Sequence, residues 1–234
     1  MSREVTVRWA DLDGFDPEAL EPLLSGDELA RGRRLRFARD RSRFIVARGL
    51  LRTVLGERLG SAPGAIEFAY CERGKPRLGS ETGPRFNLSH SGPVLALALS
   101  EGREVGIDIE AIREGITAEG IARRYLPAGV AAEVGRRSGP ERTEEFFRAW
   151  VRQEAYAKAR GGGLELIGQA PGPDWTVMDL EIAPGYAAAL ALEGGALLDD
   201  CEQLVADLSR VGHPAVELRE MGDVLRAGAP EPAA

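Results

Sequence analysis

Hydrophobic and polar residues alternate strictly over residues 105–110, whose sequence is Val-Gly-Ile-Asp-Ile-Glu. This period of two predicts a β-strand, because successive side chains of a strand point to opposite faces of the sheet. The apolar side chains then face the core, whereas Asp108 and Glu110 project from the other face beside Gly106, which leaves room for a close approach. Two such carboxylates suit a hard cation such as Mg²⁺ or Mn²⁺, although a strand with a solvated acidic face has the same pattern.

The hydrophobic periods of strands and of helices predict the elements along the rest of the chain. Strands are expected over residues 4–11, 66–70, 94–99, 174–182 and 186–192. Helices are expected from Ser25 or Asp27, from residue 40 to about 60, and over 116–126, 130–136 and 141–160. A helix followed by a hairpin in each half suits a duplicated unit, with halves 1–112 and 113–226. Residues 196–226 fit helix, strand and helix ambiguously, and residues 227–234 are expected to be a disordered tail.

The strands expected over 94–99 and 105–110 should pair as an antiparallel hairpin, because only a short turn separates them. This pairing brings the polar loop Ser89-His90-Ser91 to the Glu110 end of the hairpin. A serine beside a histidine is also found in nucleophilic catalysis, but adjacent residues seldom reach each other as nucleophile and base. We interpret the loop as an anion-binding turn that uses hydroxyl, imidazole and backbone N–H groups.

The helix expected over residues 141–160 has an unusual stripe. At 100° per residue, the stripe carries Phe147, Trp150, Val151, Glu154 and Lys158. The face that should be buried therefore begins with aromatic residues and ends with a carboxylate and an ammonium one turn apart. Burying an unpaired charge would lower stability by about 3–5 kcal/mol, the loss that follows when one partner of a buried ion pair is removed. The position favours a pocket wall, whereas an ordinary Glu-Lys pair on a solvated helix face is the alternative.

Composition and charge narrow the class of protein. The chain has 234 residues, of which 44% are hydrophobic and 29% are charged, as in a globular protein. The net charge of −7 argues against general binding to nucleic acid or an anionic membrane. No apolar run reaches the ~20 residues of a membrane span and no signal peptide is recognisable, so we expect a cytoplasmic protein. Cys71 and Cys201 lie far apart without metal-ligand spacing and are expected to be free thiols.

The positive charges are almost all arginine. Among 30 basic residues, lysine occurs only at Lys75 and Lys158. The two lysines indicate positions where a compact ammonium, whose pKa shifts readily, is needed in place of a guanidinium. The alternative is that lysine occurs at these two positions by chance. Residues 31–52 contain nine arginines and one acid, Asp40, which makes this segment an anion-binding candidate suited to an acidic partner surface.

Four short blocks carry a resemblance to a known family. They are Gly74-Lys75-Pro76, the run Phe-Asn-Leu-Ser-His-Ser at 86–91, residues 105–110, and the run from Trp150 to Lys158 followed by Gly163-Leu164. In order and spacing these blocks resemble the Sfp-type 4′-phosphopantetheinyl transferases, over roughly residues 30–192. The resemblance implies an α+β fold of two pseudo-symmetric halves with the active site at their interface. It also implies transfer of phosphopantetheine from coenzyme A, the co-substrate, to a serine of an apo carrier protein, with Mg²⁺ as cofactor or Mn²⁺ in its place.

The resemblance assigns roles to residues at matching positions. Metal ligands would be Asp108, Glu110 and Glu154. Glu154 would also activate the carrier serine as general base, directly or through water, and Lys158 would neutralise charge on the departing diphosphate. Asp108 and Lys158 would also contact coenzyme A, together with Arg31, Arg73, Lys75, Asn87, Ser89 and His90. Ser89 and His90 would bind its 3′-phosphate.

One residue departs from the family pattern, because Gln153 stands where many members have lysine. Helical geometry points position 153 about 100° away from Glu154, so activity should survive. A catalytically weak relative that binds coenzyme A or a carrier as an interaction module is an alternative, and a metal-dependent phosphohydrolase is another. The expected partner is an apo acyl or peptidyl carrier protein of fatty acid, polyketide or nonribosomal peptide biosynthesis, and a monomer would suffice.

Overall fold

The computed structural model describes residues 5–71, 74–79 and 83–194, and the backbone of three short strands beyond them. The chain has a mixed α+β fold, as predicted. Its strands are β1 (Val5–Asp11), β2 (Phe68–Tyr70), β3 (Pro76–Leu78), β4 (Arg85–Ser91), β5 (Val94–Ser100), β6 (Val105–Ala111), β7 (Trp175–Leu180), β8 (Tyr186–Glu193), β9 (Val205–Asp207), β10 (Ser209–Arg210) and β11 (Glu217–Leu218). Its α-helices are α1 (Pro17–Leu20), α2 (Gly26–Arg33), α3 (Ala38–Leu59), α4 (Ala118–Tyr125), α5 (Ala128–Arg136) and α6 (Gly139–Ala159). Short 3-10 helices are Leu12–Gly14, Glu21–Leu23, Pro63–Ala65 and Leu164–Leu166.

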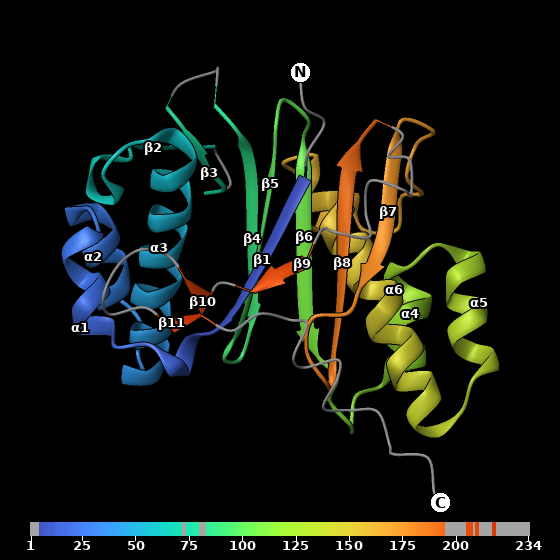
Figure 1. Cartoon of the computed structure of the whole chain (residues 1–234). Helices are drawn as coiled ribbons and strands as arrows, with labels where there is room; N and C mark the ends of the chain where they lie inside the picture. The colour runs from blue at the N-terminus through green and yellow to red at the C-terminus, as the bar shows by residue number, and fades with distance from the viewer. Residues whose placement is uncertain are drawn as a thin grey trace, which may run out of the picture.

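Two sheets form the centre of the molecule, with one long helix on the outer side of each (Figure 1). The first sheet has the order β4-β5-β1-β9 and the second has the order β6-β8-β7. Helix α3 packs on the first sheet through a core that includes Leu51 and Leu97, and α6 packs on the second through Val151 and Ala189. A third apolar cluster, which includes Ile107, fills the space between the sheets. Because Ile107 faces this core, the polar residues of β6 face α6.

Most predicted elements are confirmed. Ser25 caps α2 in a capping box with Glu28, with hydrogen bonds of 3.3 and 2.9 Å between side chain and backbone. Helix α3 ends at Gly60, whose φ of 63° suits a glycine after a helix, and α6 ends before Gly161. The hairpin of β7 and β8 forms as the sequence predicts.

The predicted hairpin of residues 94–99 with 105–110 is wrong. Strand β5 pairs with β1 and β4, whereas β6 pairs with β8 in the other sheet. All seven residues of β5 are buried, because it is an inner strand with an apolar layer on both faces. Residues 89–91 are accordingly the end of strand β4 and not a loop.

Some expectations fall outside the described residues. These are the tail at 227–234, the thiol of Cys201, the side chain of Arg73 and all of 196–226 except the backbone of β9, β10 and β11. Cys71 is a free, half-buried thiol. Among the helices of the described part, none has both the length and the apolar character that crossing a membrane requires.

Candidate active site

Gly106 sets the distance between strand β6 and helix α6. A Cβ atom at this position would overlap the carbonyl oxygen of Ala155 and the backbone nitrogen of Ala159, and would lie 2.9 Å from Cα of Ala159. The helix backbone therefore rests directly on the strand, which only a glycine permits. The neighbouring helix positions, Glu154 and Lys158, are thereby brought to the polar face of β6. The close approach expected at Gly106 is made by this helix.

Lys158 and Asp108 form the centre of the site. The Lys158 ammonium donates hydrogen bonds to Oδ1 of Asp108 at 2.5 Å and to Oγ of Ser89 at 2.8 Å. Ser89 in turn donates to the same Oδ1 of Asp108 at 2.8 Å. Asp108 is 4% exposed, and its Oδ2 atom is buried without a hydrogen-bond partner among the described residues. An unpaired buried carboxylate oxygen next to a cation is a group arranged to accept a further ligand.

Strand β4 holds the acidic face of β6 through side chains at every second position, a set of contacts that we call the β4–β6 seam. The side-chain Oδ1 atom of Asn87 accepts the Ile107 N–H at 2.9 Å. The Ser91 hydroxyl donates to Oε2 of Glu110 at 2.8 Å and accepts the N–H of Ala111 at 3.1 Å. Together with the contact of Ser89 to Asp108, the seam fixes both carboxylates of β6.

Glu154 is half-buried beside these groups. Burial raises the pKa of Glu154, and the negative charge of Asp108 raises it further. The positive charge of Lys158 offsets part of this rise in the pKa of Glu154, whereas the negative charge of Glu110 adds to the rise. Glu154 has no hydrogen-bond or ion-pair partner among the described residues. A carboxylate of raised pKa in this setting can take a proton from a substrate hydroxyl.

The three acids predicted as metal ligands lie in one region, where Asp108 and Glu110 act electrostatically on Glu154. Within the described residues, no three carboxylate, imidazole or thiol groups stand close enough together to hold a metal ion as they are. The chemistry of the groups nevertheless fits Mg²⁺, which prefers carboxylate oxygens and substrate phosphates. The unpartnered Oδ2 atom of Asp108 is one such oxygen.

Lys75 lies at the end of α6, and Arg31 lies beside Gly74, the residue before Lys75. The Lys75 ammonium donates to the carbonyl oxygen of Lys158 at 2.7 Å, and burial lowers the pKa of Lys75. The guanidinium of Arg31 lies 4.9 Å from the ring centre of Tyr70, and a Cβ at Gly74 would be 3.9 Å from its Nη2 atom. Arg31, Lys75 and Lys158 therefore bring three positive charges to one region, as an anionic ligand requires.

His90 does not share a face with Ser89. Neighbouring side chains on strand β4 point to opposite sides, so Ser89 faces Asp108 whereas His90 is exposed on the side of α3. Partial desolvation of its ring lowers the pKa of His90, and the positive charge of Lys158 lowers it further. The joint binding of one phosphate by these two residues stays a prediction.

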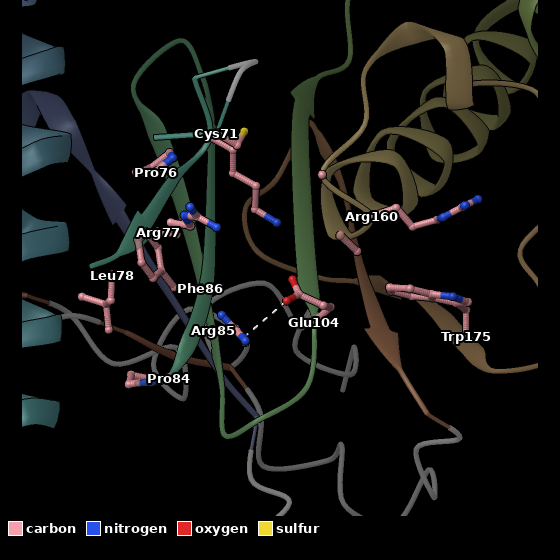
Figure 2. Close-up of a pocket in the computed structure, with 13 residues that line it drawn as sticks. Cys71, Pro76, Arg77, Leu78, Pro84, Arg85, Phe86, Glu104, Arg160 and Trp175 are labelled. Atoms are coloured by element: carbon pink, nitrogen blue, oxygen red, sulfur yellow. Dashed lines mark ion pairs between the residues drawn. The ribbon is translucent and has the colours of Figure 1, made fainter. Parts of the chain in front are cut away.

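A cavity of about 480 Å³ opens beside this site, between β3, β4 and the end of α6 (Figure 2). Phe86 lines it from one side and Trp175 from the other, with the 3.3 Å ion pair of Arg85 and Glu104 in its wall. Its volume is in the range of small-molecule sites. This cavity could not be predicted from sequence, because its lining comes from segments that lie far apart along the chain. Ser91 was predicted only as part of an anion-binding turn, whereas its hydroxyl contacts Glu110.

Comparisons with known proteins agree with this geometry. Residues 104–196 match the 4′-phosphopantetheinyl transferase superfamily, and residues 18–102 match the 4′-phosphopantetheinyl transferase N-terminal family. The 4′-phosphopantetheinyl transferase HetI of Nostoc sp. is 37% identical over 194 residues, which is 75% of this chain and 81% of HetI. The 4′-phosphopantetheinyl transferase AcpT of Escherichia coli O157:H7 is 40% identical over 127 residues, which is 54% of this chain and 62% of AcpT. A 4′-phosphopantetheinyl transferase of Bacillus subtilis is 27% identical over 155 residues, which is 66% of this chain and 68% of that relative.

The mixed α+β fold and these matches define the class of protein as a transferase. The chain belongs to the 4′-phosphopantetheinyl transferase superfamily.

Proposed function

We propose that this protein transfers the 4′-phosphopantetheinyl group from coenzyme A to a serine hydroxyl of an apo carrier protein, as an Sfp-type member of its family. The observation that carries the proposal is the meeting of Lys158, Asp108 and Glu154 at the contact of α6 with β6. An ammonium and carboxylates on rigid elements provide charge neutralisation and a base, which is what transfer of a phosphoryl-type group requires.

In this reaction the serine oxygen attacks the phosphorus next to the pantetheine arm. The bond from that phosphorus to the bridging oxygen breaks, and adenosine 3′,5′-bisphosphate leaves. Glu154 takes the serine proton, directly or through a water molecule, and its raised pKa makes it a stronger base than an ordinary glutamate. Lys158 stabilises the charge on the leaving bisphosphate.

Asp108, Glu110 and Glu154 would hold Mg²⁺. The ion would supply further neutralisation of the pyrophosphate charge. Asp108 can offer its unpartnered Oδ2 while Oδ1 stays with Lys158 and Ser89. The seam from β4 keeps Glu110 oriented through Ser91.

Coenzyme A would be bound by the positive groups around the end of α6. Arg31 and Lys75 would contact its phosphates, and Ser89 and His90 its 3′-phosphate. Arg73 and Asn87 would assist, although the Asn87 carbonyl oxygen is engaged by Ile107 and leaves only the amide N–H groups. The proposal includes a monomer of two halves, 1–112 and 113–226, that acts in the cytoplasm.

The test mixes the protein with an apo carrier protein, coenzyme A and Mg²⁺ and measures the carrier by mass spectrometry. The carrier should gain the mass of phosphopantetheine, and Asp108→Ala and Glu154→Ala should each lower the rate by at least about 100-fold. Full activity of either variant would refute the assignment of the site. Binding without any gain in mass would indicate an interaction module, and free phosphopantetheine without a carrier would indicate a phosphohydrolase.

A further inference from the structure

A dense positive surface surrounds the start of helix α3, outside the site described above. We call it the arginine surface and define it by Arg33, Arg34, Arg36, Phe37, Arg39 and Arg41. All six side chains are exposed, and none of the five arginines forms an ion pair with a described residue. By contrast, the next arginine along α3, Arg43, is paired with Asp13 at 2.5 Å. The protein as a whole has a net charge of −7, so this concentration of one sign is a local feature.

Phe37, at the centre of this surface, is unusual both in its exposure and in its position at the start of a helix. Its side chain is 58% exposed, the highest value among the large hydrophobic residues in the described part of the chain. It also occupies the N-cap position of α3 and offers no side-chain hydrogen bond to the helix, where serine, threonine, aspartate or asparagine would do so. A residue that stabilises neither the core nor the helix end points to a role in binding.

The composition of the arginine surface identifies the kind of partner. The guanidinium of Arg36 lies 5.3 Å from the ring centre of Phe37, so the two present one combined cationic and aromatic surface. Arginine and aromatic residues are the side chains most enriched among those that dominate protein–protein binding energy. Unpaired like charges repel one another until a partner brings opposite charge. The complementary face therefore carries carboxylates around an apolar recess.

Helix α3 connects this surface to the active site. Two turns after Phe37, Arg43 acts electrostatically on His90, as does Asp40. His90 is in turn influenced by Lys158. A protein held on the arginine surface would thus lie next to the groups that carry the proposed chemistry.

We propose that the arginine surface docks the carrier protein, with Phe37 inserted into an apolar recess of an acidic face. This inference rests on the proposed function for the identity of the partner. The net negative charge of the molecule disfavours an extended polyanion, whereas a compact acidic protein can meet the local surface.

The test compares Phe37→Ser and Arg36→Glu with the matched controls Leu59→Ser and Arg136→Glu. Leu59 is 39% exposed at the other end of α3, and Arg136 is exposed on α5. At saturating coenzyme A, Phe37→Ser and Arg36→Glu should each raise KM for the carrier by about 10-fold or more. They should leave kcat and KM for coenzyme A unchanged, and neither control should change KM for the carrier. Because serine is a good N-cap, Phe37→Ser should also raise the thermal midpoint.

The outcomes separate this proposal from the proposed function. An unchanged KM for the carrier in both variants overturns the docking surface and leaves the transferase intact. If the wild-type protein transfers nothing, calorimetric titration with the apo carrier decides: binding that Phe37→Ser weakens sustains the surface, whereas equal or absent binding overturns it. Variants that lose affinity for duplex DNA or phosphatidylserine vesicles but keep their affinity for the carrier also overturn it, in favour of an anionic polymer or membrane.

Discussion

The ammonium of Lys75 donates a hydrogen bond of 2.7 Å to the backbone carbonyl of Lys158, so the two lysines of the chain are in direct contact. The same carbonyl also accepts the N–H of Gly161 at 3.1 Å, and the Lys75 ammonium adds a positive charge at the end of α6, where the helix dipole favours it. It leaves the side chain of Lys158 free to reach Asp108 and Ser89. The two lysines thus lie in one network, in which Lys75 contacts the backbone of Lys158 and the Lys158 side chain contacts Asp108.

Gly106→Ala should abolish most of the transferase activity. The added methyl group would overlap the α6 backbone at Ala155 and Ala159, so the helix must move away from β6. We expect the free energy of unfolding to fall by about 3 kcal/mol, the upper end for an overfilled core. Urea denaturation and transfer assays measure the two effects. In the control Gly129→Ala, the methyl group meets no atom within 4 Å and replaces a helical glycine, so stability should rise by about 0.5–1 kcal/mol.

Glu154→Gln should stabilise the protein increasingly as the pH rises. The folded-state pKa of Glu154 lies above its ordinary value of 4.5, so the fold favours the protonated form. The associated stability is present below pH 4.5 and is lost as the pH rises through the raised pKa. Glutamine does not titrate and resembles the protonated form. Urea denaturation without Mg²⁺ from about pH 4 to 8 should show a difference between variant and wild type that grows and then levels. A difference that is constant over this range would contradict the raised pKa.

Lys158→Gln should raise the pKa of Glu154 further, because it removes the one positive charge that lowers it. The carboxyl carbon chemical shift of Glu154, followed by NMR through a pH titration, measures this change directly. The assignment comes from the signal that disappears in Glu154→Gln. A pKa that stays the same or falls in Lys158→Gln would show that the two side chains do not interact.

Ser91→Ala should weaken the response to Mg²⁺ while leaving the fold intact. The substitution removes the hydroxyl that holds Glu110 at 2.8 Å and leaves the N–H of Ala111 without this acceptor. Loss of a group that orients a metal ligand typically lowers metal affinity by about 10–100-fold. The Mg²⁺ concentration for half-maximal activity and the Mg²⁺-induced shift in thermal midpoint should both show this change. Ser138→Ala is the control, because Ser138 makes no side-chain hydrogen bond at the start of α6.

Gln153→Lys should not increase activity, although it restores the residue common in the family. Gln153 is 6% exposed, and its Oε1 atom accepts the N–H of Gly168 at 2.9 Å. Lysine has no acceptor and would place an ammonium in this buried position, so stability should fall by about 1–3 kcal/mol. Gln169→Lys is the control, because Gln169 is exposed and its side-chain hydrogen bonds, of 3.2 and 3.4 Å, are long. A variant at position 153 with full stability and faster transfer would show that Gln153 limits the enzyme.

The local elements could be predicted from sequence because their causes are local. The cap at Ser25, the stop at Gly161 and the alternation over 105–110 each depend on a few neighbouring residues. The pairing of β5 could not be predicted in this way. Its partner β1 lies about ninety residues earlier in the chain, and a strand buried on both faces fits several partners equally well.

The sequence predicted which residues form the candidate site better than it predicted how their side chains are oriented. The helix stripe indicated that Glu154 and Lys158 share a pocket wall; in the structure Lys158 contacts Asp108, and Asp108 acts electrostatically on Glu154. The opposite directions of Ser89 and His90 follow from strand periodicity, but only once 85–91 is known to be a strand. The glycine at 106 indicated a close approach but not what approaches, since the helix that it accommodates begins more than thirty residues later.

The β4–β6 seam has a consequence for solubility. Strands β4 and β6 are the terminal strands of their sheets, and unprotected sheet edges recruit strands from other molecules. Asn87 and Ser91 occupy backbone N–H groups of β6 that would otherwise invite such recruitment. The side chains that orient the active-site acids therefore also leave fewer free N–H groups on the open edge of β6 for a strand of another molecule.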